Sequence, residues 1–383
     1  MNEDKATRYN RLKRQVSVVS VAWSVVFLLA LVVSGGSAAL RDAAGGVASL
    51  VAPASWWRAG TVAVYVLFIT LLNEVGSFPL AFYGGFVLER RYGLSTQPLG
   101  AWLADQAKSL LLAGVLGIVA AVILYAFISR YPFGWWLPAA VVFALLILVL
   151  ANLGPLLLLP MFYSIKPLSR DALRARLVAL GQRAGARVLD AYEWGLGAKT
   201  SKANAALTGL GGSRRILVSD TMLAQYSDDE IEVVLAHELA HHVHGDIWKG
   251  LGFESALIVA GFFAASWLLR LAAPMAGLHG TDDVAGLPLL LLAAGAVSMV
   301  MVPAAHAMSR AHERRADRFA LTLTRNPPAF ISAMRRLAAQ NLAEDEPSAL
   351  VQWLFHSHPP IRERIVAAQN WRGQTPGSDP ITR

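Results

Sequence analysis

Six long apolar runs dominate the chain, each long enough to cross the roughly 30 Å hydrocarbon core of a bilayer as a helix. Between the first two runs, segment 35–54 is rich in Ala and Gly and carries Arg41 and Asp42, so it is either a loop or a poor seventh membrane element. The pattern predicts a mainly α-helical, polytopic membrane protein with six or seven transmembrane helices. The six runs are 16–33, 61–86, 110–128, 136–161, 251–271 and 287–308.

Two polar regions separate or follow these runs. The first opens with an amphipathic segment and contains three strand-like stretches, 187–194, 200–207 and 214–218, with Gly-rich turns between them. The second is helical in composition and closes in a Gly/Pro/Ser tail that we expect to be disordered. This organisation predicts four parts: an N-terminal membrane region with four spans (1–162), a small α+β part with a three-stranded sheet (163–249), a transmembrane hairpin (250–308) and a C-terminal helical part (309–383).

Composition and charge agree with a membrane protein. The chain of 383 residues is 55% hydrophobic and 16% charged, with a mean hydropathy of +0.46. All but four of its 34 Lys and Arg residues fall in the N-terminal tail, the loop 87–109, the region 162–250 and the C-terminal region. The positive-inside rule therefore places both ends and both polar regions in the cytosol. The net charge of +8 suits a lipid bilayer as partner, and without a nucleic-acid motif we predict no nucleic-acid partner.

The first polar region contains the sequence His237-Glu238-Leu239-Ala240-His241. Residues i and i+4 share one face of a helix, so both imidazoles can bind one zinc ion while Glu238 takes a proton from a water molecule. A capping box, Ser227 to Glu230, starts a helix just upstream. These features predict a zinc metalloprotease.

A catalytic zinc needs a third protein ligand. The chain has no cysteine, which leaves His and carboxylate side chains as the strong ligands. His244 would lie too far along the helix axis, so we prefer Glu313, with Asp317 one turn on to orient a ligating imidazole. A solvated, ion-paired helix is the alternative for the segment around Glu313. Because two membrane runs separate His241 from Glu313, shared ligation would place the metal at the cytosolic membrane boundary.

Several of these segments resemble the integral-membrane CAAX prenyl protease family, which are gluzincin endopeptidases. The resemblance covers most of the chain from about residue 61 onward. It lies in Phe86-Val87-Leu88-Glu89-Arg90-Arg91-Tyr92-Gly93-Leu94, Ser201-Lys202-Ala203-Asn204-Ala205, the run from Ser309-Arg310 to Asp317, and His358-Pro359-Pro360, together with the zinc helix.

The resemblance implies that His237, His241 and Glu313 bind one zinc ion and that Glu238 is the general base and acid. It also implies that Asn204, on an edge strand, and His358 face the reacting peptide, which would be added as a strand along 200–207. We assign Asp317 and Arg310 to positions that support the ligands. The family fold places the membrane helices around a chamber, with the metalloprotease domain on the cytosolic side.

We therefore expect a zinc-dependent membrane endopeptidase that cleaves peptides or membrane-protein tails. Arg outnumbers Lys 27 to 7, which is typical of GC-rich bacteria, so we expect a bacterial cytoplasmic membrane. One alternative is an HtpX-like quality-control metalloprotease, which has fewer membrane helices. An alternative from another class is a transporter or scaffold with a structural zinc, although that class has no need for Glu238.

Overall fold

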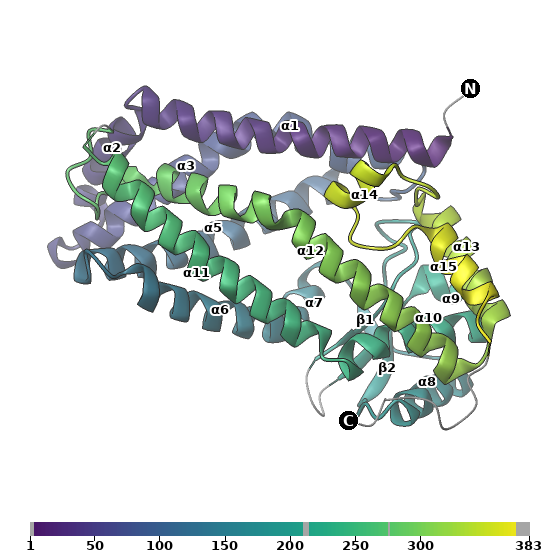
Figure 1. Cartoon of the computed structure of the whole chain (residues 1–383). Coiled ribbons are helices and arrows are strands. Elements are labelled where there is room, and N and C mark those ends of the chain that lie inside the picture. The colour runs from purple at the N-terminus through teal and green to yellow at the C-terminus, as the bar shows by residue number, and fades with distance from the viewer. Residues whose placement is uncertain (1–3, 210–213, 275, 373–383) are drawn as a thin grey trace.

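The computed structural model describes residues 4–209, 214–274 and 276–372 of the chain. Long helices run side by side in one half of the molecule, and a smaller part with a β-sheet lies beyond one end of them (Figure 1). The C-terminal tail, which the sequence predicts to be disordered, is outside the described residues from 373 onward.

Among the described residues, six helices are long and apolar enough to cross a membrane, which confirms the six runs predicted from hydropathy. The first, third, fifth and last of these helices extend beyond the predicted apolar runs by polar ends, most of all the last helix. The six are α1 (Lys5–Val33), α3 (Trp57–Phe82), α5 (Leu99–Arg130), α6 (Trp136–Leu157), α11 (Asp246–Ala272) and α12 (Leu287–Thr324).

The segment that the sequence left open, 35–54, forms the helix α2 (Gly36–Val51). The Ser37 hydroxyl donates to the carbonyl of Ala285 at 2.6 Å and lies 2.7 Å from the hydroxyl of Tyr65. Ala285 belongs to the short 3-10 turn η4 (Val284–Gly286), which precedes α12. The helix α2 therefore packs where α12 begins, at the end of the bundle remote from the sheet (Figure 1).

The sheet has four strands in the order β1-β2-β4-β3, one more than the sequence predicts. The missed strand, β1 (Ile165–Pro167), is three residues long and pairs with β2 (Asp190–Trp194). The other strands are β3 (Ala205–Thr208) and β4 (Arg215–Ser219), which pair antiparallel. The predicted strand 200–207 is thus too long at its start, because residues 199–201 bond to the loop 93–96 instead.

The helix α10 (Asp228–Val243) carries the zinc motif and begins at the predicted capping box. The Ser227 hydroxyl accepts from the Glu230 N–H at 3.3 Å, and the Glu230 carboxylate accepts from the Ser227 N–H at 2.8 Å. Its apolar face packs against the sheet and against α8 (Asp171–Arg183), with Leu235, Leu239 and Ile216 fully buried. This packing holds the motif rigidly.

The helices α11 and α12 form the predicted membrane hairpin, with Gly261 against Ala294. The helix α12 has 38 residues and continues through the predicted boundary at 308/309, so one continuous helix links the apolar run to Glu313. The remaining elements are the 3-10 turn η1 (Ala54–Trp56), the π-helical turn η2 (Tyr83–Val87), α4 (Leu88–Arg91), α7 (Leu159–Phe162), α9 (Asp220–Gln225), α13 (Pro327–Asn341), α14 (Ala349–Phe355) and α15 (Ile361–Gln369).

Candidate metal centre

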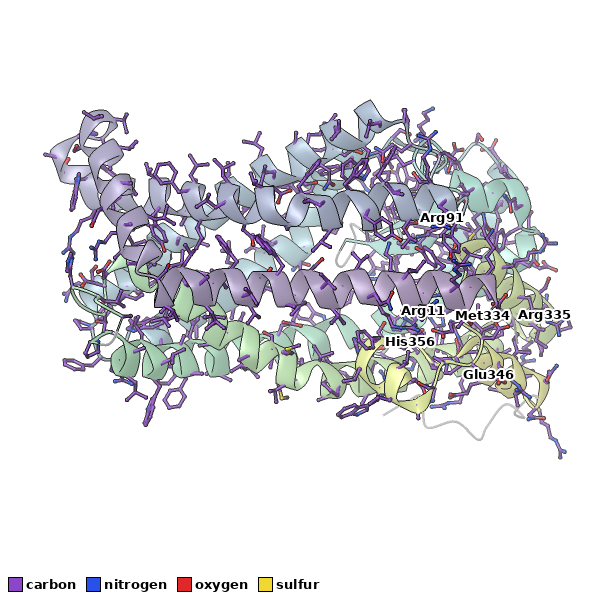
Figure 2. All side chains as sticks on the ribbon, turned by 90° about the horizontal axis from the view of Figure 1, so that it is seen from above. Arg11, Arg91, Met334, Arg335, Glu346 and His356 are labelled. Carbon is purple, nitrogen blue, oxygen red and sulfur yellow. The ribbon has the colours of Figure 1, made fainter. Side chains whose placement is uncertain are left out.

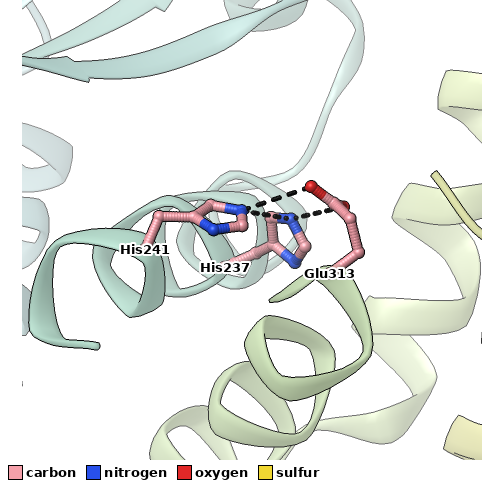
Figure 3. A group of neighbouring side chains, drawn as sticks. All are labelled: His237, His241 and Glu313. Carbon is pink, nitrogen blue, oxygen red and sulfur yellow. Dashed lines mark hydrogen bonds and ion pairs between the residues drawn. The ribbon is translucent and has the colours of Figure 1, made fainter. Parts of the chain in front are cut away.

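Three side chains from two helices converge on one point (Figure 3). His237 and His241 lie one turn apart on α10, and Glu313 reaches them from α12. The two Nε2 atoms are 3.4 Å apart, and the Glu313 carboxylate oxygens lie 3.2 Å from His237 Nε2 and 3.4 Å from His241 Nε2. One donor atom from each residue lies within 4.8 Å of the others, so the three could hold a metal ion.

The carboxylate of Asp317, which we predict to orient a ligating imidazole, lies on the far side of the first imidazole from Glu313. His237 Nδ1 is 2.9 Å from Asp317 Oδ1, which leaves Nε2 free to point at Glu313. Asp317 also accepts two hydrogen bonds from the Arg364 guanidinium, at 2.5 and 2.8 Å. No local sequence pattern indicates Arg364, because only the fold brings α15 against α12. The only signal in the sequence was its position six residues after His358.

The second imidazole has a carboxylate of its own, which was not among the predicted site residues. His241 Nδ1 is 3.1 Å from Asp246 Oδ2, and Asp246 in turn pairs with Arg315 and with Lys249. Gly245 makes this contact possible, because its φ of 66° turns the chain sharply between α10 and α11. A Gly-Asp pair directly after the zinc helix was the signal in the sequence.

The chemistry of these donors fits a divalent cation. Glu313 is buried, and its Oε2 has only the Nε2 of His237 near it, at 3.2 Å, without a well-directed hydrogen bond among the residues that the structure describes. Burial opposes a charge on His237, but the carboxylates of Asp317 and Glu313 raise its pKa to about 9. A cation bound to Nε2 takes the place of that proton.

Glu238, His358 and Asn204 surround this centre and line one cleft of about 590 Å³ with His237 and Glu313. Burial raises the pKa of the Glu238 carboxyl. His358 Nε2 is 3.3 Å from Glu313 Oε1. Asn204 is exposed and directly precedes β3, the last strand of the sheet, as its predicted edge position requires.

The cleft also has a wall from the membrane helices. Lys13 and Arg14 of α1 line it opposite the catalytic part. Figure 2 shows Arg11 on the same stretch of α1, close in that view to His356 and Met334 of the C-terminal part. The metal centre thus lies where the first membrane helix meets the sheet-containing part.

Arg310 and His244 lie near this centre but are not among its three donor residues. Arg310, which we expected to support the ligands, instead donates to the backbone carbonyls of Gln352 and His356 at 3.1 and 2.7 Å. It therefore holds the loop that carries His358. His244 donates through Nδ1 to the Ala240 carbonyl at the end of α10 and makes an edge-to-face contact with Phe319, outside the group of three donors.

Family models match both halves of this architecture. Residues 167–372 match the model of peptidase family M48, and residues 2–164 match the model of a CAAX prenyl protease N-terminal region with five membrane helices. The chain belongs to peptidase family M48. It is therefore an integral, multi-pass membrane metalloprotease, as the sequence predicts. In the described part of residues 2–164, this M48 protease has four helices long and apolar enough to cross a membrane, α1, α3, α5 and α6, and the shorter α2 of 16 residues packs against them.

Comparisons with individual proteins agree with the two family models. An uncharacterized metalloprotease of Bacillus subtilis, YhfN, is 29% identical over 368 residues, which are 95% of this M48 protease and 84% of YhfN. CAAX prenyl protease 1 of Saccharomyces cerevisiae is 30% identical over 247 residues, 62% of this chain and 53% of the yeast protein. The crystal structure of S. mikatae Ste24p has a TM-score of 0.84 at 22% identity, over 95% of this chain and 88% of that one, which confirms the predicted fold class.

Proposed function

We propose that this M48 protease is a zinc-dependent endopeptidase that cleaves peptides or membrane-protein tails at the cytosolic membrane boundary. The observation that carries the proposal is the convergence of His237, His241 and Glu313, with the carboxylate of Glu238 on the same helix. Two imidazoles and one carboxylate, in a chain without cysteine, are the ligands of many catalytic zinc sites. Bound zinc supplies a Lewis acid that polarises the scissile carbonyl and makes water more acidic.

The protein's own groups then handle protons and charge. Glu238 takes a proton from the attacking water and passes it to the leaving amine, and its raised pKa brings the carboxyl closer to the neutral range where a general base and acid works best. His358 lies beside Glu313 and is placed to stabilise the oxyanion. Asn204 and the edge strand β3 bind the peptide main chain beside this centre.

Charge and topology support a cytosolic site. Lys13 and Arg14 place the N-terminal end of α1 at the cleft, and the basic residues of the N-terminal tail favour the cytosol. The relatives named CAAX prenyl protease make prenylated C-terminal peptides one substrate class to test. The high Arg content favours a bacterial cytoplasmic membrane and hence unprenylated substrates. An HtpX-like quality-control protease is disfavoured by the N-terminal model match over residues 2–164.

Replacement of Glu238 by Gln tests the proposal. We expect Glu238→Gln to keep stoichiometric zinc, measured by elemental analysis of detergent-purified protein, and to lose at least about a hundredfold in cleavage rate. The probes are a fluorogenic peptide library and the same peptides carrying a C-terminal farnesyl cysteine. Glu232→Gln, on the same helix and paired with Arg176, is the matched control and should cleave normally. Undiminished turnover by Glu238→Gln would show that the assignment is wrong.

A further inference from the structure

Only part of the outward-facing edge of β3 is open to an added strand, because side chains already bond to backbone groups at its two ends. In an antiparallel pair, successive residues direct their N–H and C=O groups alternately to the partner strand and away from it. The Asn204 carbonyl accepts from the Ser219 N–H at 3.0 Å, so Asn204 faces β4. Ala205 pairs with Val218 in the register and therefore faces away from β4, as do Ala203 and Leu207.

A side-chain amide already occupies the first of these outward-facing residues. Asn341, the last residue of α13, accepts from the Ala203 N–H at 3.1 Å and donates to the Ala203 carbonyl at 3.3 Å. One amide thus makes both hydrogen bonds that a peptide group of an added strand would make. Gln340 continues the line by donating to the Ser201 carbonyl at 2.7 Å.

An imidazole occupies the other end. His242, the residue after the ligand His241, has its Nε2 at 3.1 Å from the Leu207 carbonyl and donates to it. His242 belongs to the rigid helix α10, so its position is fixed relative to the metal ligands. Between Asn341 and His242, the N–H and C=O of Ala205 and the N–H of Leu207 are the outward backbone groups directed at an incoming strand.

We propose that Asn341 and His242 bracket the peptide-binding edge, so that substrate pairs its main chain with Ala205 in one register relative to the metal centre. Ala203, Asn204, Ala205 and Asn341 line the same cleft as His237 and Glu238, so a strand held at Ala205 passes directly by the reacting groups. The proposal rests on the proposed peptidase function and makes Asn341 and His242 determinants of which bond is cut.

The position of the cut tests the bracket. Without the imidazole, in His242→Ala, pairing can extend to Leu207, and without the amide, in Asn341→Ala, it can extend to Ala203. Strand side chains alternate with a period of two, so slipped registers that keep the same faces differ by two residues. For a synthetic peptide that the wild type cuts at one main bond, we expect products displaced by two residues. The displacement should run in opposite directions in the two variants, and each displaced product should rise about fivefold.

Matched controls separate the bracket from general damage. His244→Ala removes an imidazole from the same helix end, and Gln340→Ala removes an amide next to Asn341, yet neither opens a group adjacent to Ala205. His242→Gln keeps a donor near the Leu207 carbonyl and should restore the single cut. Asn341→Asp keeps the acceptor for the Ala203 N–H and should slip less than Asn341→Ala. Zinc content, measured for every variant, should stay at the wild-type level.

The outcomes are distinct. Unchanged cleavage positions in folded, zinc-loaded His242→Ala and Asn341→Ala would overturn the bracket while leaving the peptidase function intact. If the wild type cleaves none of the peptides, the proposed function itself is refuted. Mass spectrometry of the products reads both results in one experiment.

Discussion

Two buried carboxylates, Glu313 and Glu89, lie at the junction of membrane helices and catalytic part, and their surroundings differ. Glu89, on α4, accepts hydrogen bonds from the Tyr9 hydroxyl at 2.6 Å and from the Lys202 ammonium at 2.9 Å, and it also pairs with Lys13. Glu313 has three imidazoles nearby, from His237, His241 and His358, and one oxygen that accepts no hydrogen bond within the described ranges. Glu89 is saturated by two lysines and a tyrosine hydroxyl, whereas the near partners of Glu313 are imidazoles.

This difference separates a structural carboxylate, Glu89, from a proposed ligand, Glu313. A buried charge costs several kcal/mol unless partners compensate it. The partners of Glu89 come from α1 and from the segment before β3, so its compensation ties α1, α4 and the substrate edge together. Without a metal, the proton that the raised pKa keeps on His237 compensates Glu313, and a divalent cation bound to the imidazoles can take the place of such protons. A buried carboxylate whose nearest partners are imidazoles, rather than lysines, is therefore the one to suspect of binding metal.

The largest expected contrast comes from truncating each carboxylate. Glu313→Ala should lose zinc and cleavage altogether while its folded state persists, because it removes a proposed ligand together with its buried charge. Glu89→Ala should keep zinc in its folded fraction and destabilise the protein by about 3–5 kcal/mol, because it leaves two lysines at the junction without their carboxylate. Elemental analysis and denaturant unfolding in detergent measure the two effects.

The contrast between Glu313 and Glu89 fails if each variant shows the effect expected of the other. A full zinc load in Glu313→Ala would show that another residue completes the site. Zinc loss from Glu89→Ala of normal stability would show that the junction, too, is part of the metal centre.

A smaller effect is expected from His358, which lies beside Glu313 but is not a proposed ligand. His358→Ala should lower kcat about 10²- to 10³-fold, the usual loss for an oxyanion donor, with zinc retained and KM changed less. His356→Ala is the matched control, because its imidazole faces Glu344 at 3.7 Å. Equal losses in kcat for both variants would assign His358 to loop structure rather than to the reaction.

Local patterns predicted which side chains meet at the candidate metal centre better than they predicted the groups around them. The i, i+4 spacing of His237 and His241, and the carboxylates Glu313 and Asp317 on one helix, follow from helix periodicity alone. Arg364 acts on Asp317 from 47 residues further along the chain, and no local period encodes that contact. Asp246 was missed for a different reason, because it depends on a left-handed turn at Gly245.

In the fold, too, features set by local sequence were easier to predict than those set by tertiary contacts. Apolar runs of membrane length predicted six helices, since the bilayer sets their length independently of tertiary contacts. The sheet was harder to predict. The strand β1 is only three residues long, and residues 199–201 prefer the loop 93–96 over β4. Likewise, the bonds from Asn341 and His242 to the edge strand arise only when α13 and α10 pack beside it.

Asp317 is intermediate between the two carboxylates, because it is saturated by Arg364 and yet orients a ligand. Asp317→Ala should weaken zinc binding about 10- to 100-fold, the usual effect of removing the partner of a ligating His, without abolishing it. Competition with a chromogenic chelator measures the affinity, and Arg318→Ala, an exposed neighbour on α12, is the control. Unchanged affinity would mean that α10 alone fixes the His237 ring. Complete loss of zinc would place Asp317 among the ligands and remove the distinction between saturated and open carboxylates.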